Sequence, residues 1–461
     1  MRQNKIPDFS RYFSRGIVSI FFVLAVLAVP SMSREGSGQR NKGPESNMVI
    51  PWPVGMEEFA FPTLPAGGWN VLGTASARTT AMGETFLSEK GPAAGIVNPA
   101  LLARLDRPMI SLSYRYTAHA YKTLPGFALA DILGGPEPSS SSFKREVGYP
   151  DSLGLAFPIK RWTFSADYFL YQEYNTPSSS ASFFSMPNKV KQSGETRGIS
   201  LAIAHSLTDS FSVGISASYL YGRISRFEVF PIYAILRNSD PESLAEDIRR
   251  LIRGPAFSWP VSRADMDLDL GGIAVSLGAS YRWKDHLLLG FSLRAPFTLN
   301  LQADVTWTYP GAKRPEERIS REIKLDQPFV ATGSLLYFPT SSFTVAADLS
   351  YWDWKGCRSE DNFRRMYPNG FENILKLNLG AEYAIELPSP VIKTLALRAG
   401  YIHDPQPYRN PEGFVRDFAT AGIGLEIGRF LFDAAAKIQL FDPDPGRFRA
   451  NIFRVGLSYE F

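Results

Sequence analysis

The sequence predicts an all-β fold, a transmembrane antiparallel β-barrel of about 14 strands. Three observations predict it. Apolar and polar residues alternate at period two in many segments from residue 109 to residue 461, with turn-forming residues between the segments. Residues 1–33 have the order of a secretory signal, so the mature chain is expected to leave the cytoplasm. Mean hydropathy is −0.11, and beyond that signal no stretch approaches the roughly 20 apolar residues of a spanning helix.

The composition disfavours several other classes of protein. The chain has 49 Lys and Arg against 45 Asp and Glu, a formal charge of +4, and the two signs are interspersed. A nucleic-acid binder would concentrate basic residues on one face or in one domain. Cys357 is the single cysteine, and the 4 histidines lie far apart, so no internal disulfide and no zinc site of ordinary spacing is expected. We therefore expect no metal and no cofactor.

The first 68 residues are assigned to targeting and to a leader. Arg2, Lys5, Arg11 and Arg15 precede an apolar run over residues 16–29, and small residues follow, which predicts a signal peptide at 1–33. The run is short for a membrane span, so an uncleaved anchor is the less favoured alternative. Residues 34–68 are rich in Gly, Ser and Pro without periodicity, which indicates an extended leader.

Strands are expected over most of the remaining chain. Between residues 212 and 222 apolar side chains occupy every second position, and Leu220 breaks the pattern. The same reading predicts strands near 108–119, 149–158, 161–171, 195–207, 211–225, 265–282, 286–308, 321–338, 342–354, 371–386, 393–403, 414–427, 430–440 and 451–461. Several exceed the roughly 9 to 11 residues that a tilted strand needs to cross hydrocarbon, so they are expected to project beyond the bilayer.

A secreted soluble sandwich is the competing fold, because it also buries one face of every strand. A sandwich of this size would be expected to split into domains, whereas the strands here continue to the last residue without a clear boundary. Closing the sheet into a barrel pairs the backbone N–H and C=O groups of the edge strands, which would otherwise lack hydrogen-bond partners in lipid. The barrel is therefore favoured.

Motifs in four parts of the chain occur in a fixed order. They lie at residues 73–83 with 95–101, which contains Asn-Pro-Ala, at 289–297, which contains Arg-x-Pro, at 345–355, and at 398–407 followed by Arg416 and 422–425. From about residue 72 to residue 461 the chain resembles the FadL/TodX family of outer-membrane channels for long-chain fatty acids and other hydrophobic compounds. The resemblance implies an outer-membrane location, a plug or hatch inside the barrel, and a terminal Phe461 that assembly machinery reads.

The plug is expected at residues 69–107 and the barrel at 108–461. Small residues allow the plug backbone to pack closely inside a lumen, and Asn98 and Pro99 favour a turn. An ordinary structural turn is the alternative for this motif. Pro296, within a predicted strand, would remove a ladder hydrogen bond and so could open a lateral gap. The candidate plug and gating residues are Gly73, Gly83, Asn98, Pro99, Ala100 and Pro296.

A long external loop at residues 225–264 is the candidate ligand-collecting region. It contains an apolar run and a predicted helix that begins near Asp240 and ends before Gly254. One face of that helix is apolar and arginines flank it, which would suit an acyl chain with an anionic head group. The candidate ligand-binding residues are Phe227, Phe230, Leu244, Ile248, Arg249, Leu251 and Ile252. The alternative is a helix that caps the barrel while its arginines meet lipopolysaccharide phosphate or solvent.

The favoured function is passive transport of long-chain fatty acids or other hydrophobic compounds by a monomer in contact with outer-membrane lipid and lipopolysaccharide. The alternative is a barrel of the same superfamily that serves as an attachment or shuttle factor for secreted proteins. A nonspecific porin would need neither the plug nor the apolar external segment. No nucleophile motif such as Gly-x-Ser-x-Gly is present, so no catalytic residue is predicted and an outer-membrane hydrolase is disfavoured.

Overall fold

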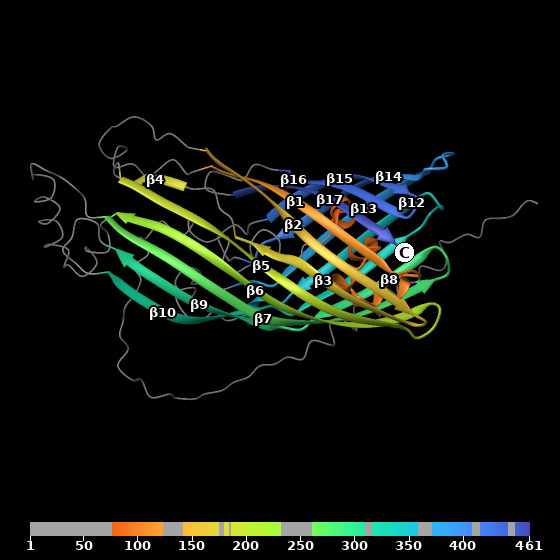
Figure 1. Ribbon diagram of the computed structural model, residues 1–461, viewed down its shortest axis with the longest axis horizontal. Coiled ribbons are helices and arrows are strands. Elements are labelled where there is room, and N and C mark those ends of the chain that lie inside the picture. The colour runs from red at the N-terminus through yellow and green to blue at the C-terminus, as the bar shows by residue number, and fades with distance from the viewer. Residues whose placement is uncertain are drawn as a thin grey trace, which may run out of the picture. The chain divides into compact units, whose positions relative to one another are not determined.

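The computed structural model describes residues 76–122, 142–174, 179–183, 186–231, 261–308, 316–357, 371–407, 415–440 and 448–461 (Figure 1). Its strands form one antiparallel sheet that closes on itself. The first strand, β1 (Met109–Lys122), pairs with β2 (Ser142–Ile159) on one side and with the last strand, β17 (Phe448–Glu460), on the other. Closure leaves no open edge, which is the condition for a sheet to stand in lipid.

The remaining strands follow one another around the ring. They are β3 (Trp162–Glu173), β4 (Ser179–Phe183), β5 (Met186–Ser206), β6 (Phe211–Pro231), β7 (Val261–Trp283), β8 (Leu287–Arg294), β9 (Phe297–Thr308), β10 (Glu317–Gln327), β11 (Val330–Tyr337), β12 (Phe343–Trp352), β13 (Ile374–Glu386), β14 (Ile392–Pro405), β15 (Val415–Ile427) and β16 (Phe430–Gln439).

The predicted number of strands is confirmed, although three strands are interrupted. The sheet has 17 strand segments, and β3 with β4, β8 with β9, and β10 with β11 each form one strand of the ring, which gives 17 − 3 = 14. The predictions of continuous strands at 286–308 and 321–338 were therefore wrong in detail. At two of these interruptions the inward-facing positions lie three residues apart instead of two, from Arg294 to Phe297 and from Gln327 to Val330. One extra residue therefore shifts the alternation, as in a β-bulge.

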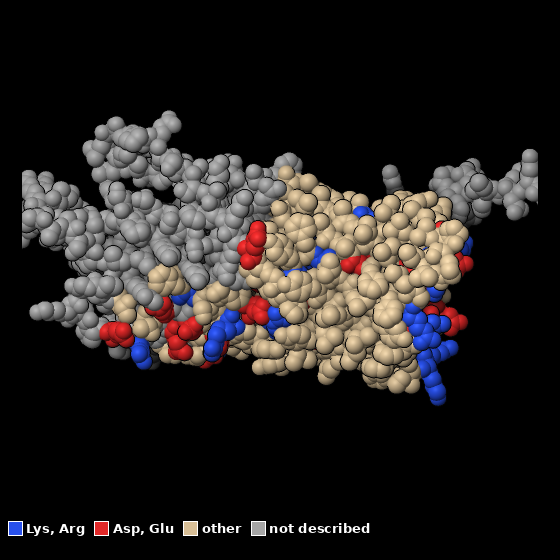
Figure 2. Space-filling model, turned by 45° about the horizontal axis from the view of Figure 1, so that its top comes forward, with Lys and Arg blue, Asp and Glu red and all other residues tan. Residues whose placement is uncertain are grey.

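The exposed face of the strands has the polarity expected for lipid. Leu201 and Ile273 are 63% and 62% exposed, whereas Ser200 and Ser218, on the opposite face, are buried. Figure 2 shows a largely uncharged surface over the middle of the described barrel, with charged residues gathered toward its two ends. A soluble sandwich would bury its apolar face, so this inverted arrangement decides for the membrane barrel.

A short helical segment precedes β1. It comprises α3 (Ala77–Ala81), η2 (Phe86–Ser88), α4 (Ala94–Val97) and η3 (Pro99–Arg104). Its helix α3 contacts β14 to β17, η2 contacts β8, β11 and β12, and η3 contacts β2, β3 and β5 to β7, so the segment touches strands on all sides of the ring (Figure 1). Within the described ranges no helix combines the length and the apolar character that a bilayer span requires.

The two ends of the barrel differ in the length of their connections. Strands β6 and β7 are joined at residues 232–260, whereas β7 and β8 are joined by the turn at residues 284–286. Short turns are typical of the periplasmic end and long connections of the extracellular end. The short-turn end, near which the helical segment and Phe461 lie, is therefore the periplasmic end by this rule.

Candidate functional site

Close backbone contact fixes the first turn of the helical segment against the barrel wall. Ser76 caps α3 by accepting a hydrogen bond from the Thr79 amide at 3.2 Å. Gly83 follows α3 with φ of +65°, and a Cβ there would overlap the carbonyl oxygen of Leu379 on β13. Gly380 and Gly400 face it from β13 and β14 with equally little room. Gly83 therefore packs closely against the wall, and its role in gating stays a prediction, whereas Gly73 lies outside the described residues.

The Asn-Pro-Ala turn lies on the opposite side of the ring. Asn98 Oδ1 accepts a hydrogen bond from the Ala100 amide at 3.2 Å, and Asn98 Nδ2 donates to the carbonyl oxygens of Ala279 and Phe291, both at 3.4 Å. Pro99 occupies the first turn of η3, where its missing N–H costs nothing. These residues therefore cap a helix and also tie it to β7 and β8.

Ion pairs hold the same segment to β13 and β16. Glu84 lies 2.9 Å from Lys437 Nζ and 3.8 Å from Lys376 Nζ, and Lys376 is in turn 3.5 Å from Asp404. Burial by itself would raise the pKa of Glu84, but the two ammonium groups hold it below its ordinary value. A second group joins Arg78 to Glu382 at 2.6 Å. This side of the lumen is charged and well paired.

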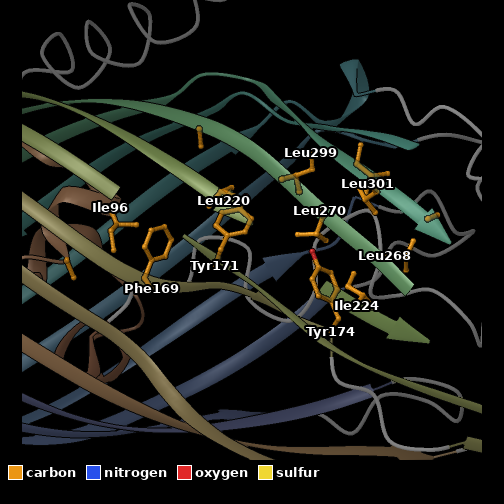
Figure 3. Packing of buried hydrophobic residues seen from close by; sticks show 14 residues of the cluster. Ile96, Phe169, Tyr171, Tyr174, Leu220, Ile224, Leu268, Leu270, Leu299 and Leu301 are labelled. Carbon is orange, nitrogen blue, oxygen red and sulfur yellow. The ribbon is translucent and has the colours of Figure 1, made fainter. Parts of the chain in front are cut away.

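The other side of the lumen is apolar near the extracellular end. A buried cluster, which we call the apolar track, runs from the helical segment along β3, β6, β7, β9 and β10 (Figure 3). Its members are Ala93, Ile96, Phe169, Tyr171, Tyr174, Leu220, Ile224, Leu268, Leu270, Ala274, Leu299, Leu301, Ala303 and Leu325, with Phe297 packed against them. Barrel interiors are ordinarily polar, so an apolar interior strip is the feature that requires a functional explanation.

The polarity of the wall inverts where the apolar track begins. On the outer face of β7, Ile273 and Leu277 are exposed apolar residues, whereas Asp267 and Asp269 occupy the same face nearer the extracellular end. On the inner face of β6 the order is reversed, from Ser216 and Ser218 to Leu220 and beyond. The strands have therefore left the hydrocarbon by this level, and their outer face is charged, as the cluster of charges at the left of Figure 2 shows.

Sequence reasoning did not assign this track. Its signal was present in Leu220, the one residue that broke the alternation of its strand, because Leu220 is 0% exposed on the inner face. It was also present in Leu268, Leu270, Leu299 and Leu301, which alternate with polar residues as in a soluble sheet. The sequence alone does not show which face of those strands points into the barrel and which points outward, because that depends on how the ring closes.

Most predicted ligand-binding residues lie outside the described part of the chain. Leu244, Ile248, Arg249, Leu251 and Ile252 are in this group, so the collecting helix stays a prediction. Phe227 and Phe230 lie on β6, in register with Asp265 and Ser262 of β7, and Phe227 is half-buried. The expected loop at 225–264 was therefore too long, because the β6–β7 ladder continues to Pro231 and Val261.

Pro296 lies in an interruption that two neighbouring strands share. Residues 295–296 separate β8 from β9, and residues 328–329 separate β10 from β11 at the same level. Strand β7 lies on the other side of this interruption. It pairs with β9 up to Gly271 and with β8 from Ser276, and residues 272–275 lie between the two ladders. Across this gap the Ala295 amide donates a hydrogen bond to the Val275 carbonyl oxygen at 3.0 Å. Ala295 and Pro296 are exposed and belong to neither strand, and a role of Pro296 in gating stays a prediction.

A small cavity lined by both charged and apolar residues lies at the periplasmic end, between the helical segment and the wall. Its volume is about 140 Å³, and Arg78, Lys90, Glu382, Arg398 and Asp433 are among its lining residues. Among the described residues no group of three or more His, Cys, Asp and Glu side chains has the geometry to hold a metal ion.

Comparisons with known proteins agree with this architecture. The model of a family described as outer membrane protein transport protein (OMPP1/FadL/TodX) matches residues 63–416. A solved structure of a FadL homologue from Pseudomonas aeruginosa is 19% identical with a TM-score of 0.58, and the match covers 84% of this chain and 98% of that one. The toluene transporter TbuX of Ralstonia pickettii is 15% identical over 85% of this chain and 100% of its own, with a TM-score of 0.58.

The toluene transporter TodX of P. putida gives a similar result. It is 15% identical with a TM-score of 0.59, and the match covers 85% of this chain and 99% of that one. A comparison with curated proteins found no match. At these identities the solved structures support the fold, and the family model carries the assignment to a family.

Proposed function

Since the chain belongs to the OMPP1/FadL/TodX family of outer membrane transport proteins, we propose that it is a passive channel for long-chain fatty acids or other hydrophobic compounds. It is a multi-pass β-barrel of the outer membrane. Solved structures with the same fold include toluene transporters and a monoaromatic hydrocarbon channel, and compounds of this kind are included in the proposed substrate class.

The observation that carries the proposal is the apolar track. Ile224, Leu268 and Leu301 line the lumen above the level of the bilayer, where the outer face of the same strands is polar or charged. An aqueous pore would gain nothing from this lining, whereas a hydrophobic compound leaving water would gain roughly 25 cal/mol per Å² of apolar surface buried. The track is therefore the proposed binding route, and Phe227 and Phe230, farther along β6, are proposed as further ligand contacts.

The helical segment is proposed to be the plug, extending over residues 69–107. Its contacts with strands on all sides of the ring, through Gly83 and the turn Asn98–Pro99–Ala100, support this role because they obstruct direct passage along the axis. The cavity beside Arg78 is the proposed place where the plug moves to open a path toward the periplasm. The shared interruption at Pro296 is the proposed lateral exit into the membrane.

The barrel is further proposed to act as a monomer surrounded by outer-membrane lipid and lipopolysaccharide. The ring closes through the pairing of β1 with β17 in one chain, which supports this proposal because no second chain is needed to complete the wall. Hydrolysis or nucleotide use forms no part of the proposed transport, which follows the gradient of the substrate.

Uptake by cells that lack their own channels of this family tests the function. Cells that express the chain are expected to take up radiolabelled palmitate or toluene faster than cells with the empty vector, at concentrations at which diffusion is slow. Planar bilayers that contain the purified protein are expected to show a low ionic current. A large steady current without faster uptake of either compound would identify a porin and contradict the proposal.

A further inference from the structure

Three short turns at the periplasmic end are neighbours around the ring. They join β2 to β3, β5 to β6 and β7 to β8, at residues 160–161, 207–210 and 284–286. Backbone hydrogen bonds tie each turn to the next strand along. The Ser206 amide donates to the Arg161 carbonyl oxygen at 2.9 Å, and the Arg282 amide donates to the Ser210 carbonyl oxygen at 2.8 Å. The three turns therefore form one continuous stretch of the rim.

This stretch carries an excess of exposed positive charge. Its basic residues are Lys160, Arg161, Arg282 and Lys284, and its acidic residues are Asp209 and Asp285. Arg161 lies 3.9 Å from Asp209, but both side chains are largely exposed, so water screens the pair. Among the described residues, no carboxylate lies within ion-pair distance of Lys160 or Lys284. We call this stretch the basic rim, and basic side chains project at this end of the barrel, at the right of Figure 2.

Apolar and aromatic residues of the lipid-facing side adjoin the cations of the basic rim. Ile159 and Trp162 are register partners and are both exposed, and the first turn of the rim lies directly between them. On β7, Tyr281 and Trp283 are exposed immediately before Lys284. Trp and Tyr on the outer face of a membrane protein gather at the level of the lipid head groups. The cations of the rim therefore stand at the edge of the hydrocarbon, at that level.

The same end of the barrel differs on the side of β13 to β17. The charged residues near its turns there are Lys393, Arg429, Glu386, Glu426 and Glu460. Lys393 Nζ lies 3.5 Å from Glu426 and donates to the Gly428 carbonyl oxygen at 3.0 Å. Aromatic residues are present on this side too, since the Phe430 and Tyr459 rings have centroids 4.8 Å apart. The aromatic residues thus occur on both sides, whereas the positive excess is confined to the basic rim.

We propose that the basic rim is a binding site for anionic phospholipids of the inner leaflet of the outer membrane, with Lys160 and Lys284 as the principal contacts of the lipid phosphate. An ammonium group donates charge-assisted hydrogen bonds to phosphate oxygens. The exposed Trp162 and Trp283 would lie against the adjoining part of the same lipids. A zwitterionic phospholipid gains less, because its own ammonium group already offsets its phosphate. The site is outside the lumen and does not depend on which compound the barrel transports.

Quenching of tryptophan fluorescence by brominated phospholipids tests the site, because two tryptophans adjoin its cations. The full-length protein is placed in bilayers of equal parts phosphatidylglycerol and phosphatidylethanolamine, with bromine on the acyl chains of one lipid or of the other. Subtracting the signal of the double variant Trp162→Phe with Trp283→Phe isolates the two reporters. At low salt, phosphatidylglycerol is expected to associate about tenfold or more tightly than phosphatidylethanolamine, since each basic residue near an anionic lipid surface contributes a factor of about five.

Matched variants make the result specific to the basic rim. Lys160→Gln with Lys284→Gln is expected to reduce the preference to about twofold or less. Lys393→Gln with Arg429→Gln removes the same charge from the other side and should keep the wild-type preference. Lys160→Arg with Lys284→Arg retains the charge and should keep it as well.

Salt provides a second measurement, which decides the question if the first double variant does not assemble. Raising the ionic strength from about 0.1 M to about 1 M shortens the screening length from about 10 Å to about 3 Å. The preference of the wild type for phosphatidylglycerol at Trp162 and Trp283 is therefore expected to fall close to one.

Three results would overturn the site. One is equal association of the two lipids with the wild type, and another is a preference that neither salt nor the loss of Lys160 and Lys284 reduces. The third is an equal loss in the variant of Lys393 and Arg429, which would mean that anionic lipid is attracted to the whole protein rather than to the basic rim. Each of these results leaves the proposed transport standing, because uptake is measured separately.

Discussion

Leu270 of β7 and Leu301 of β9 are register partners, and both side chains face the lumen with 6% and 2% exposed. The next pair in the ladder, Asp269 and Gln302, faces solvent on the outer side. At this level the wall has the polarity of a soluble protein, although the same β7 carries exposed Ile273 and Leu277 nearer the periplasm. One strand thus serves two environments, and its inner face changes from polar to apolar where its outer face does the opposite.

This relationship predicts that polar side chains in the track will slow capture of substrate. The double variant Leu270→Asn with Leu301→Asn is expected to reduce palmitate or toluene uptake about fivefold or more at low concentration, since each change removes about 1 kcal/mol of apolar contact. The initial rate of uptake of labelled compound measures the effect. Gln302→Ala, one residue away on the outer face, is the matched control and should leave the rate unchanged. An equal loss in both variants would contradict a role for the track.

The contact at Gly83 predicts a leak when it is disturbed. Gly83→Ala would place a methyl group on the carbonyl oxygen of Leu379 at a residue with φ of +65°, so the turn must move away from β13. Backbone strain of this kind costs about 1 to 3 kcal/mol. The variant is expected to raise the ionic current in planar bilayers and the sensitivity of cells to a large hydrophilic antibiotic. Gly333→Ala, on β11 with no atom within 4 Å of the new methyl group, should behave as the wild type.

The ring, the number of strands and the small-residue packing at Gly83 could be predicted from sequence, because alternation and glycine content are local signals. The apolar track could not. Its residues come from five strands, and whether Leu270 faces lipid or lumen depends on where the bilayer ends, which no local pattern records. The same limit explains two of the three interruptions, those between β8 and β9 and between β10 and β11. Residues 295–296 and 328–329 each shift the alternation of inward and outward side chains by one residue. In the sequence alone such a shift looks like one imperfect strand, and the pairing with the neighbouring strand is needed to recognise it as an interruption.

Arg294 shows a further limit of the sequence. Arg294 belongs to the motif at residues 289–297, and nothing in the amino-acid sequence distinguishes it from Arg398, which also lies on a strand. The difference is the partner. Arg398 meets Glu382, which lies 16 residues away in sequence, whereas Arg294 meets Trp352 and Phe297. Such pairings depend on the register of the closed ring and so follow from the structure.

The buried pair Glu84 and Lys437 predicts a pH-dependent plug. Because the pKa of Glu84 is lowered from 4.5, the folded state favours the ionised carboxylate, and the stabilisation is present above pH 4.5 and is lost as the pH falls through the lowered value. The wild type is therefore expected to conduct little at pH 7 and more near pH 3. Glu84→Gln leaves Lys437 buried without its carboxylate, which costs about 3 kcal/mol or more, so it should conduct at both pH values.

Bilayer current as a function of pH measures this effect. The informative quantity is the ratio of the current at pH 3 to that at pH 7. That ratio should be large for the wild type and near one for Glu84→Gln. A closed Glu84→Gln channel at pH 7 would show that the ion pair does not retain the plug.

The interruption shared by β8–β9 and β10–β11 predicts that sealing it will block exit from the lumen. Arg294 and Val330 are register partners, so Ala295 and Phe329 would be the next pair if the ladder continued. A disulfide between Ala295→Cys and Phe329→Cys, in a chain with Cys357→Ser, is expected to lower hydrophobic uptake severalfold, and a reductant should restore it. The matched control joins Leu293→Cys to Ala331→Cys, a pair in the intact ladder, and should leave uptake unchanged in both redox states. Full uptake with the interruption cross-linked would mean that substrate leaves past the plug instead, and the lateral exit at Pro296 would be wrong.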